Sequence, residues 1–156
     1  MKLVLWITGA ALAVIGVSAY FYFTAQQEQQ AQTEQEVEKI QETVGESNQD
    51  IGEVVSESHQ FYNGTTGYGG LQNLEMEKQV EQAEQNIEQV NELEPDSSSL
   101  EEDLEEIKTL SENVASNREM EEVRMLHRHF HDLDIALNDY DGNTKIWGVT
   151  ETLDAG

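Results

Sequence analysis

Two histidines and an aspartate near the C-terminal end form the most chemically specific group in the sequence. His131 follows His127 by four residues, and Asp134 follows His131 by three. At about 3.6 residues per turn, this spacing places all three side chains on one face of a helix. Two imidazoles and a carboxylate are suitable ligands for zinc or a similar divalent ion. The spacing therefore predicts a metal site at His127, His131 and Asp134, although Arg128 stands where the zinc-protease motif has its glutamate.

The same stretch also permits a purely structural interpretation. Arg118, Arg124 and Arg128 make this part of an otherwise acidic chain basic. The helix would then pair with acidic helices of the same domain. His129 lies on a different face from the candidate ligands, and we expect it to face solvent.

Residues 139 to 150 partly match a calcium-binding loop. Asp139, Asp141 and Asn143 supply oxygen atoms at the first, third and fifth positions. Thr144 stands where such a loop requires glycine, and Thr150 stands where it requires a bidentate glutamate. A plain turn is therefore the preferred interpretation.

The sequence contains no pattern typical of an enzyme. It lacks the Gly-x-Ser-x-Gly motif of hydrolases and a glycine-rich phosphate-binding loop that ends in lysine. It also has no cysteine, which excludes disulfides, thiolate metal sites and cysteine nucleophiles. We predict a non-enzymatic protein with no cofactor apart from the divalent ion considered above.

Charge is distributed unevenly along the chain. The net charge is −24, and all 32 acidic residues lie after the apolar N-terminal segment, together with all but one of the eight lysines and arginines. Binding to nucleic acid needs a basic surface, so nucleic acid is excluded as a partner. The acidic part is also expected to be repelled by anionic lipid head groups.

Residues 3–23 form an uncharged apolar run. Coiled as a helix, this run would be about 31 Å long, close to the thickness of a bilayer's hydrocarbon core. Lys2 precedes it and Glu28 follows it, so the positive-inside rule places the N-terminus in the cytoplasm and the remainder outside. We predict a transmembrane signal-anchor over residues 1–25 in the cell membrane. Cleavage of a signal peptide after Ala19 is the alternative.

The remainder of the chain is predicted to be all-α. A Gln/Glu-rich stalk covers residues 26–36, and an acidic helical extracytoplasmic domain covers residues 37–156. Apolar residues recur at intervals of three and four over 37–61, over 71–93 and from about residue 100 onward. This pattern predicts an antiparallel three- to four-helix bundle that follows the single-pass transmembrane helix.

Local signals predict where these helices begin and end. Four glycines within residues 62–70 indicate a loop, and Glu94-Pro95 ends the second helix. Ser98 or Ser99 should cap the third helix, and a second capping box at 116–119 should begin another. The chain would finish as a short extended tail over 145–153, with Trp147 covering the end of the bundle.

Short runs at 58–60 and 127–149 carry a family resemblance. The Ser58-His59-Gln60 run, the run from His131 to Asp134, the apolar N-terminal segment and the acidic amphipathic helices together resemble small membrane-anchored proteins of unknown function from Gram-positive bacilli. The resemblance implies a membrane location and assigns no residue a role.

Two functions are compatible with these features. The first is a structural or interaction protein whose apolar stripes at 37–61 and 76–93 pair with a protein partner or with a second copy of the chain. The alternative is an ectodomain that binds or senses a divalent metal ion through His127, His131 and Asp134.

Overall fold

The computed structural model describes residues 33–138 and 145–154, and over these residues the chain is helical with no strand. Its elements in chain order are η1 (Gln41–Gly45), α2 (Gln49–Thr66), η2 (Gly67–Asn73), α3 (Met76–Val90), α4 (Ser98–Asn117), α5 (Met120–Leu137) and α6 (Glu151–Asp154). No helix within the described residues is both long and apolar enough to cross a membrane. The predicted anchor at 3–23, most of the stalk and the first part of the candidate calcium loop lie outside the described residues.

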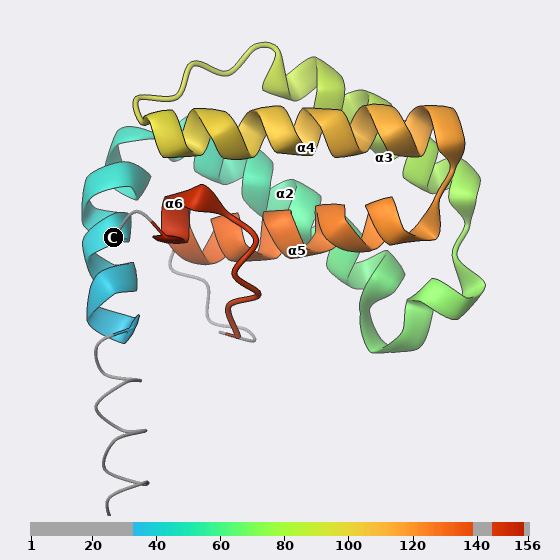
Figure 1. Cartoon of the computed structure of the whole chain (residues 1–156), viewed down its shortest axis with the longest axis horizontal. Coiled ribbons are helices and arrows are strands. Elements are labelled where there is room, and N and C mark those ends of the chain that lie inside the picture. Colours follow the sequence, from blue (N-terminus) through green and yellow to red (C-terminus); the bar gives the residue numbers. More distant parts are fainter. Residues whose placement is uncertain (1–32, 139–144, 155–156) are drawn as a thin grey trace, which may run out of the picture. The chain divides into compact units, whose positions relative to one another are not determined.

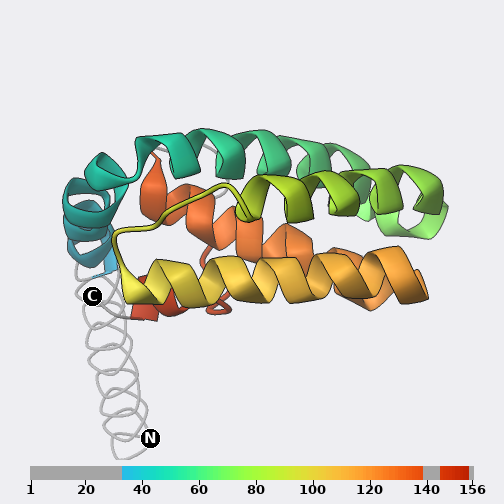
Figure 2. The same cartoon turned by 90° about the horizontal axis from the view of Figure 1, so that it is seen from above.

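Four long helices run in alternating directions and form a bundle (Figure 1). Figure 2 shows α2 beside α5 and α3 beside α4. The turn between α4 and α5 contains only Arg118 and Glu119, so these two helices pack as an antiparallel hairpin. The all-α fold and the helical bundle are confirmed.

The core is formed by side chains that repeat every three or four residues along the helices. Ile51, Val55 and Tyr62 of α2 are fully buried, as are Leu126 and Leu133 of α5. The remaining core side chains are Ile40, Ala83, Val90, Leu100, Leu104, Ile107, Leu110, Val114, Val123, Phe130, Ala136 and Leu137. Burial of this apolar surface is the main stabilising contribution, at roughly 25 cal/mol per Å².

The predicted loop over 62–70 is wrong in its first half. Helix α2 continues to Thr66, and a 3₁₀ segment follows it. The reason is tertiary packing: the fully buried Tyr62 ring stacks on Phe130, with ring centroids 5.5 Å apart. This burial outweighs the low helix propensity of Gly64. Helix α3 accordingly begins at Met76 and ends at Val90, inside the predicted range of 71–93.

The predicted starts of the last two long helices lie within about three residues of the observed starts, but the predicted capping residues are wrong. A new helix does begin after residue 116, but Glu119 is its N-cap and makes no side-chain capping bond. Ser97 is the N-cap of α4, again without a side-chain capping bond, because its hydroxyl pairs with that of Ser99 at 2.8 Å. Helix α4 ends instead with Arg118 in the left-handed conformation, at φ 57°.

Residues 37–47 lie across the C-terminal end of α5 (Figure 1). The Gln41 side-chain amide donates to the carbonyl oxygens of Ile135 (2.8 Å) and Asn138 (2.9 Å), which α5 leaves without helical partners. Gly45 follows in the same π-helical turn, where a Cβ atom would meet the Leu137 carbonyl oxygen at 2.7 Å. The absence of a side chain at Gly45 therefore permits this close contact.

Replacing Gly45 with alanine is expected to destabilise the domain. The added methyl group would push against backbone atoms of Leu137, which cannot rotate away. Overpacking of this kind costs about 1–3 kcal/mol, more than the gain in helix propensity of about 1 kcal/mol. Urea unfolding followed by circular dichroism measures the loss, and Gly64→Ala, where the added atom meets nothing within 4 Å, is the matched control.

The C-terminal residues 145–154 are held by two buried carboxylates. Asp132 of α5 accepts the backbone N–H groups of Trp147 (2.9 Å) and Val149 (3.3 Å). Asp103 of α4 accepts those of Glu151 (2.7 Å) and Thr152 (2.9 Å), which begin α6. Residues 145–150 are non-helical, and α6 stands where the end of the extended tail was predicted.

Trp147 does not cover the end of the bundle as predicted. Its side chain is 39% exposed, since the backbone rather than the ring docks this segment. Lys145 Nζ lies 3.7 Å and the Arg128 guanidinium carbon 4.8 Å from the centre of the indole ring. Both cations lie within the range of a favourable cation–π interaction with the Trp147 ring.

Candidate functional site

Three histidines from two distant parts of the sequence meet inside the bundle. His59 comes from α2, and His127 and His131 come from α5, which packs against α2. The ring centroid of His59 lies 4.9 Å from that of His131 and 5.8 Å from that of His127. The centroids of His127 and His131 are 6.4 Å apart. We call these three residues the histidine cluster.

His59 is oriented by a buried carboxylate. Its Nδ1 atom lies 2.7 Å from Asp134 Oδ2, and both side chains are at most 4% exposed. The other Asp134 oxygen accepts the Asn138 side-chain amide at 2.8 Å, and the same amide also donates to the Gly52 carbonyl at 3.0 Å. This chain of bonds fixes the His59 ring between α2 and α5.

His131 is held on both sides. Its Nε2 atom lies 2.9 Å from the carbonyl oxygen of Lys145, at the start of the C-terminal segment. Its Nδ1 atom lies 3.2 Å from His59 Nε2. The cluster is thereby connected to residues 145–154 as well as to α2.

His127 has its own partner at the end of α2. Its Nδ1 atom lies 2.8 Å from the Thr66 hydroxyl oxygen, and that hydroxyl also bonds to the Tyr62 carbonyl at 2.7 Å. The His127 ring is half-buried and stacks on His59 with an interplanar angle of 29°. The Thr66 bond depends on α2 reaching residue 66.

Burial keeps two of these imidazoles neutral at physiological pH. Burial lowers the pKa of His127 from 6.5 to about 4, and the neighbouring His59, His131 and Arg128 act in the same direction. Burial also lowers the pKa of His131, an effect that His59 increases and the bond to the Lys145 carbonyl opposes. Neutral imidazoles carry one nitrogen lone pair each, which makes them bases and metal ligands.

The stability of the metal-free protein is expected to fall in mild acid. Because the pKa of His127 is about 4 when folded and 6.5 otherwise, the unfolded chain binds more protons between these values. The free energy of unfolding is therefore lost as the pH falls from 6.5 towards 4. Full linkage would give roughly 3 kcal/mol, which solvent screening at a half-exposed ring reduces to about 1–2 kcal/mol.

Chemical unfolding at pH 6.5 and 4.5 in chelator-treated buffer measures this effect. His127→Gln is the matched variant, and its stability should change less with pH than that of the parent. Equal pH dependence in the two proteins would contradict the assignment.

The predicted metal ligands are brought together, but in a different arrangement. His127 and His131 both belong to the cluster, whereas Asp134 bonds to His59 and Asn138. In the part of the chain that the structure describes, no group of three or more His, Asp or Glu side chains is already arranged to hold a metal ion. The ligand set His127, His131 and Asp134 stays a prediction, and Asp134 has the position of a residue that supports His59.

Sequence reasoning missed His59, whose nearest cluster partner lies far along the chain. A signal was present: Val55, His59, Tyr62 and Thr66 recur at intervals of four, three and four, and all four are buried. The apolar spacing over 37–61 also includes Val54 and Phe61, which are only partly buried, so the buried face of α2 is rotated by about one residue from these two positions.

The remaining histidine and two of the three arginines also depart from expectation. His129 was expected to face solvent, but it is 3% exposed, and its Nδ1 atom bonds to the Met125 carbonyl at 3.0 Å. Arg118 pairs with Glu77 of α3, as the structural interpretation requires. Arg124 pairs within its own helix, and Arg128 contacts Trp147 instead of an acidic helix.

Comparison of the chain with protein-family models, with curated proteins and with solved structures found no match.

Proposed function

We propose that this chain is a membrane-anchored sensing protein, not an enzyme, whose helical domain lies outside the cytoplasm and responds to a small cation at the histidine cluster. The observation that carries the proposal is the burial of the His59–Asp134 pair against His131. A bundle of this size does not need buried ionisable groups for stability, since apolar side chains of similar volume pack at least as well. Their presence favours a role in binding protons or a divalent ion.

The apolar run at residues 3–23 supports the membrane location. Lys2 on one side and the strongly acidic remainder on the other favour a cytoplasmic N-terminus and an extracytoplasmic domain. A buried sensor on that side of the membrane would report the composition of the medium outside the cell.

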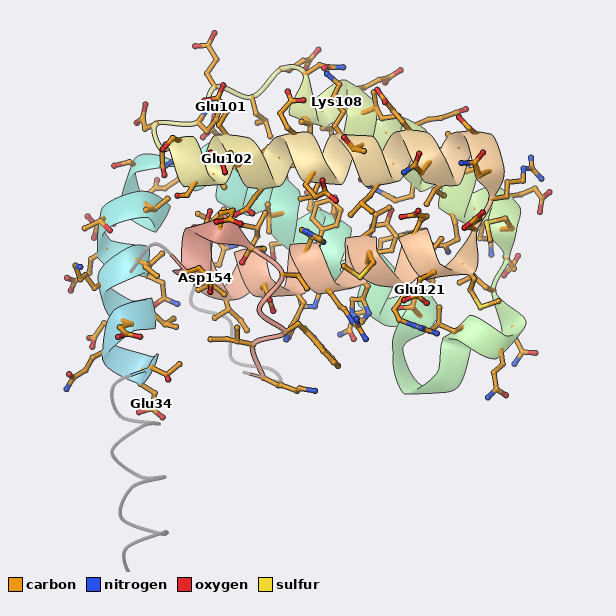
Figure 3. The ribbon with its side chains drawn as sticks, in the orientation of Figure 1. Glu34, Glu101, Glu102, Lys108, Glu121 and Asp154 are labelled. Carbon is orange, nitrogen blue, oxygen red and sulfur yellow. The ribbon has the colours of Figure 1, made fainter. Side chains whose placement is uncertain are left out.

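A structural or interaction protein is the second candidate. The stripes at 37–61 and 76–93 largely supply the domain's own core, so a partner would meet the charged outer surface instead. Helices α3 and α4 form its most acidic face, with exposed glutamates at 77, 81, 84, 88, 101, 102, 105 and 106. Figure 3 shows Glu101 and Lys108 of α4 pointing away from the bundle. Such a face favours a basic partner and disfavours a second copy of this chain.

Thermal unfolding separates the two candidates. A sensor should change its melting temperature with pH between 5 and 8, or with added divalent ions, and His127→Ala should weaken the response. If neither protons nor divalent ions change the melting temperature of the parent more than that of the variant, the sensing proposal fails. Binding of an oligolysine peptide that weakens with added salt would then support the interaction candidate.

A further inference from the structure

Residues 145–154 are held on α4 and α5 mainly through their backbone. Asp132 of α5 and Asp103 of α4 accept backbone N–H groups of this segment at 2.7–3.3 Å. Nearly every peptide has such N–H groups, so these bonds recognise a main chain and not one particular sequence. Figure 1 shows the segment, in red, lying over α5 and beside the start of α4. We call residues 145–154 the strap, and the surface of α4 and α5 that includes both carboxylates the strap site.

The side chains of the strap contribute little apolar contact. Leu153 packs against the core but is only partly buried, and the Trp147 ring is 39% exposed. Burial of apolar surface is the main source of stabilisation in a folded domain, so the strap is held more weakly than the four long helices. Segments with few buried apolar contacts open locally at a much lower cost than unfolding of the whole domain.

Two hydroxyl groups of the strap are buried without a hydrogen bond. Thr150 and Thr152 are 2% and 1% exposed, and neither hydroxyl oxygen has a partner among the described residues. Thr150 directly precedes α6, where a threonine hydroxyl ordinarily accepts an N–H group of the first turn. Asp103 accepts those N–H groups instead. A buried hydroxyl without a partner is unfavourable, so the strap is an imperfect ligand for its own site.

The Asp132 carboxylate is also incompletely compensated in the docked arrangement. Burial raises the pKa of Asp132 above its usual value, although the backbone N–H groups of residues 147–149 lower it. The loss of water around the carboxylate therefore outweighs the bonds that the strap supplies. An occupant that brings a positive charge would compensate the carboxylate better.

The strap is acidic at a place where its surroundings are acidic too. Glu151 and Asp154 are exposed residues of α6, which packs against α4. Glu101 and Glu102 lie near the N-terminal end of α4, and Figure 3 shows them at the same end of the bundle as Asp154. Because like charges repel, a neutral or basic segment would suit this surface better than the strap does.

We propose that the strap site binds a short peptide segment of a partner protein, and that the strap is its displaceable, autoinhibitory occupant. The preferred segment is neutral or basic and carries valine or a similar apolar side chain at the positions of Thr150 and Thr152. It donates backbone N–H groups to Asp103 and Asp132, as the strap does. The inference goes beyond the sensing function proposed above and does not depend on it.

Gly148 offers a way to weaken the strap without changing its site. Gly148 has a φ of 68°, and a Cβ atom added there would meet nothing within 4 Å. Alanine is strained in this conformation, so Gly148→Ala disfavours the docked strap and leaves α4 and α5 untouched. The substitution is useful because the strap belongs to the same chain and competes with any added peptide at a high effective concentration.

Fluorescence anisotropy of a fluorescein-labelled peptide added to the purified full-length chain tests the site. The probe has the sequence of residues 145–154 with the changes T150V, E151K and T152V. We expect it to bind the parent, and to bind Gly148→Ala about 10-fold more tightly because fewer of these molecules have the strap docked.

Two controls test the bonds to Asp103. Adding Asp103→Asn to Gly148→Ala should weaken binding of the probe by more than about 10-fold, because a neutral amide oxygen accepts less strongly than a carboxylate. Adding Asp50→Asn, which removes the same charge from an exposed position of α2, should leave the affinity unchanged. A probe that is N-methylated at its residues 151 and 152 lacks the two donors and should bind neither chain. This last control requires no variant at Asp103, so it stands even if Asp103→Asn fails to fold.

Hydrogen exchange of the parent measures opening of the strap directly. Its amides should exchange at least about 100-fold faster than those of the α5 core around Leu133. Equal exchange rates in the two regions would overturn the proposal, as would failure of Gly148→Ala to bind the probe or equal binding of the N-methylated probe. If Gly148→Ala dimerises and the probe does not dissociate the dimer, the site belongs to the strap of a second copy, and the assignment to a partner protein is wrong.

Discussion

Replacing His59 with alanine is expected to lower the free energy of unfolding by about 3–5 kcal/mol at pH 7. The Asp134 carboxylate is then left buried with the Asn138 amide as its remaining described partner. Removing one member of a buried, hydrogen-bonded pair is costly because the other charge stays out of water without compensation. Urea unfolding in the presence of a chelator measures the loss without any contribution from bound metal.

A double variant provides the control. In His59→Leu/Asp134→Leu both polar groups are removed and replaced by apolar side chains, which is often close to neutral in a protein interior. We expect the double variant to be more stable than His59→Ala. If it is destabilised by the sum of the two single changes, His59 and Asp134 do not act as a pair, and the description of the site is wrong.

Replacing Phe130 with alanine is expected to destabilise the domain by about 3–5 kcal/mol. Phe130 is 2% exposed and lies against the Tyr62 ring in the interface between α2 and α5. The substitution removes a large apolar side chain and leaves a cavity beside Tyr62, whose hydroxyl accepts the Asn86 amide at 3.0 Å. Thermal unfolding measures the effect.

Met120→Ala is the matched control for the loss of an apolar side chain. Met120 lies on the same helix but is 47% exposed. Its substitution is expected to change stability by less than about 0.5 kcal/mol. If Phe130→Ala were as mild as Met120→Ala, α2 and α5 would not pack as described.

Most of the bundle could be predicted from local sequence signals. Pro95 and the residues at 116–119 gave boundaries close to the end of α3 and the start of α5, because these signals act within a few residues. The end of α2 could not be predicted in this way. Glycines at 64 and 67 indicate a loop, and only the packing of Tyr62 against a helix much later in the chain overrides them.

The site was predictable only on the α5 side. A spacing of four joins His127 and His131 on one helix, so their proximity follows from helical geometry alone. The contribution of His59 depends on how α2 is rotated and on which helix it packs against. The roles of the Lys145 carbonyl and Thr66 depend on backbone positions that residue types do not reveal.

The tautomers of the three rings test the account most directly. Long-range ¹H–¹⁵N correlation spectra of the imidazoles in the metal-free full-length chain at pH 7 identify which nitrogen carries the proton. The account predicts N–H at Nδ1 of His59, Nε2 of His131 and Nδ1 of His127, because the Asp134 carboxylate, the Lys145 carbonyl and the Thr66 hydroxyl oxygen accept at these atoms. A neutral His131 that carries its proton on Nδ1 instead of Nε2 would contradict it.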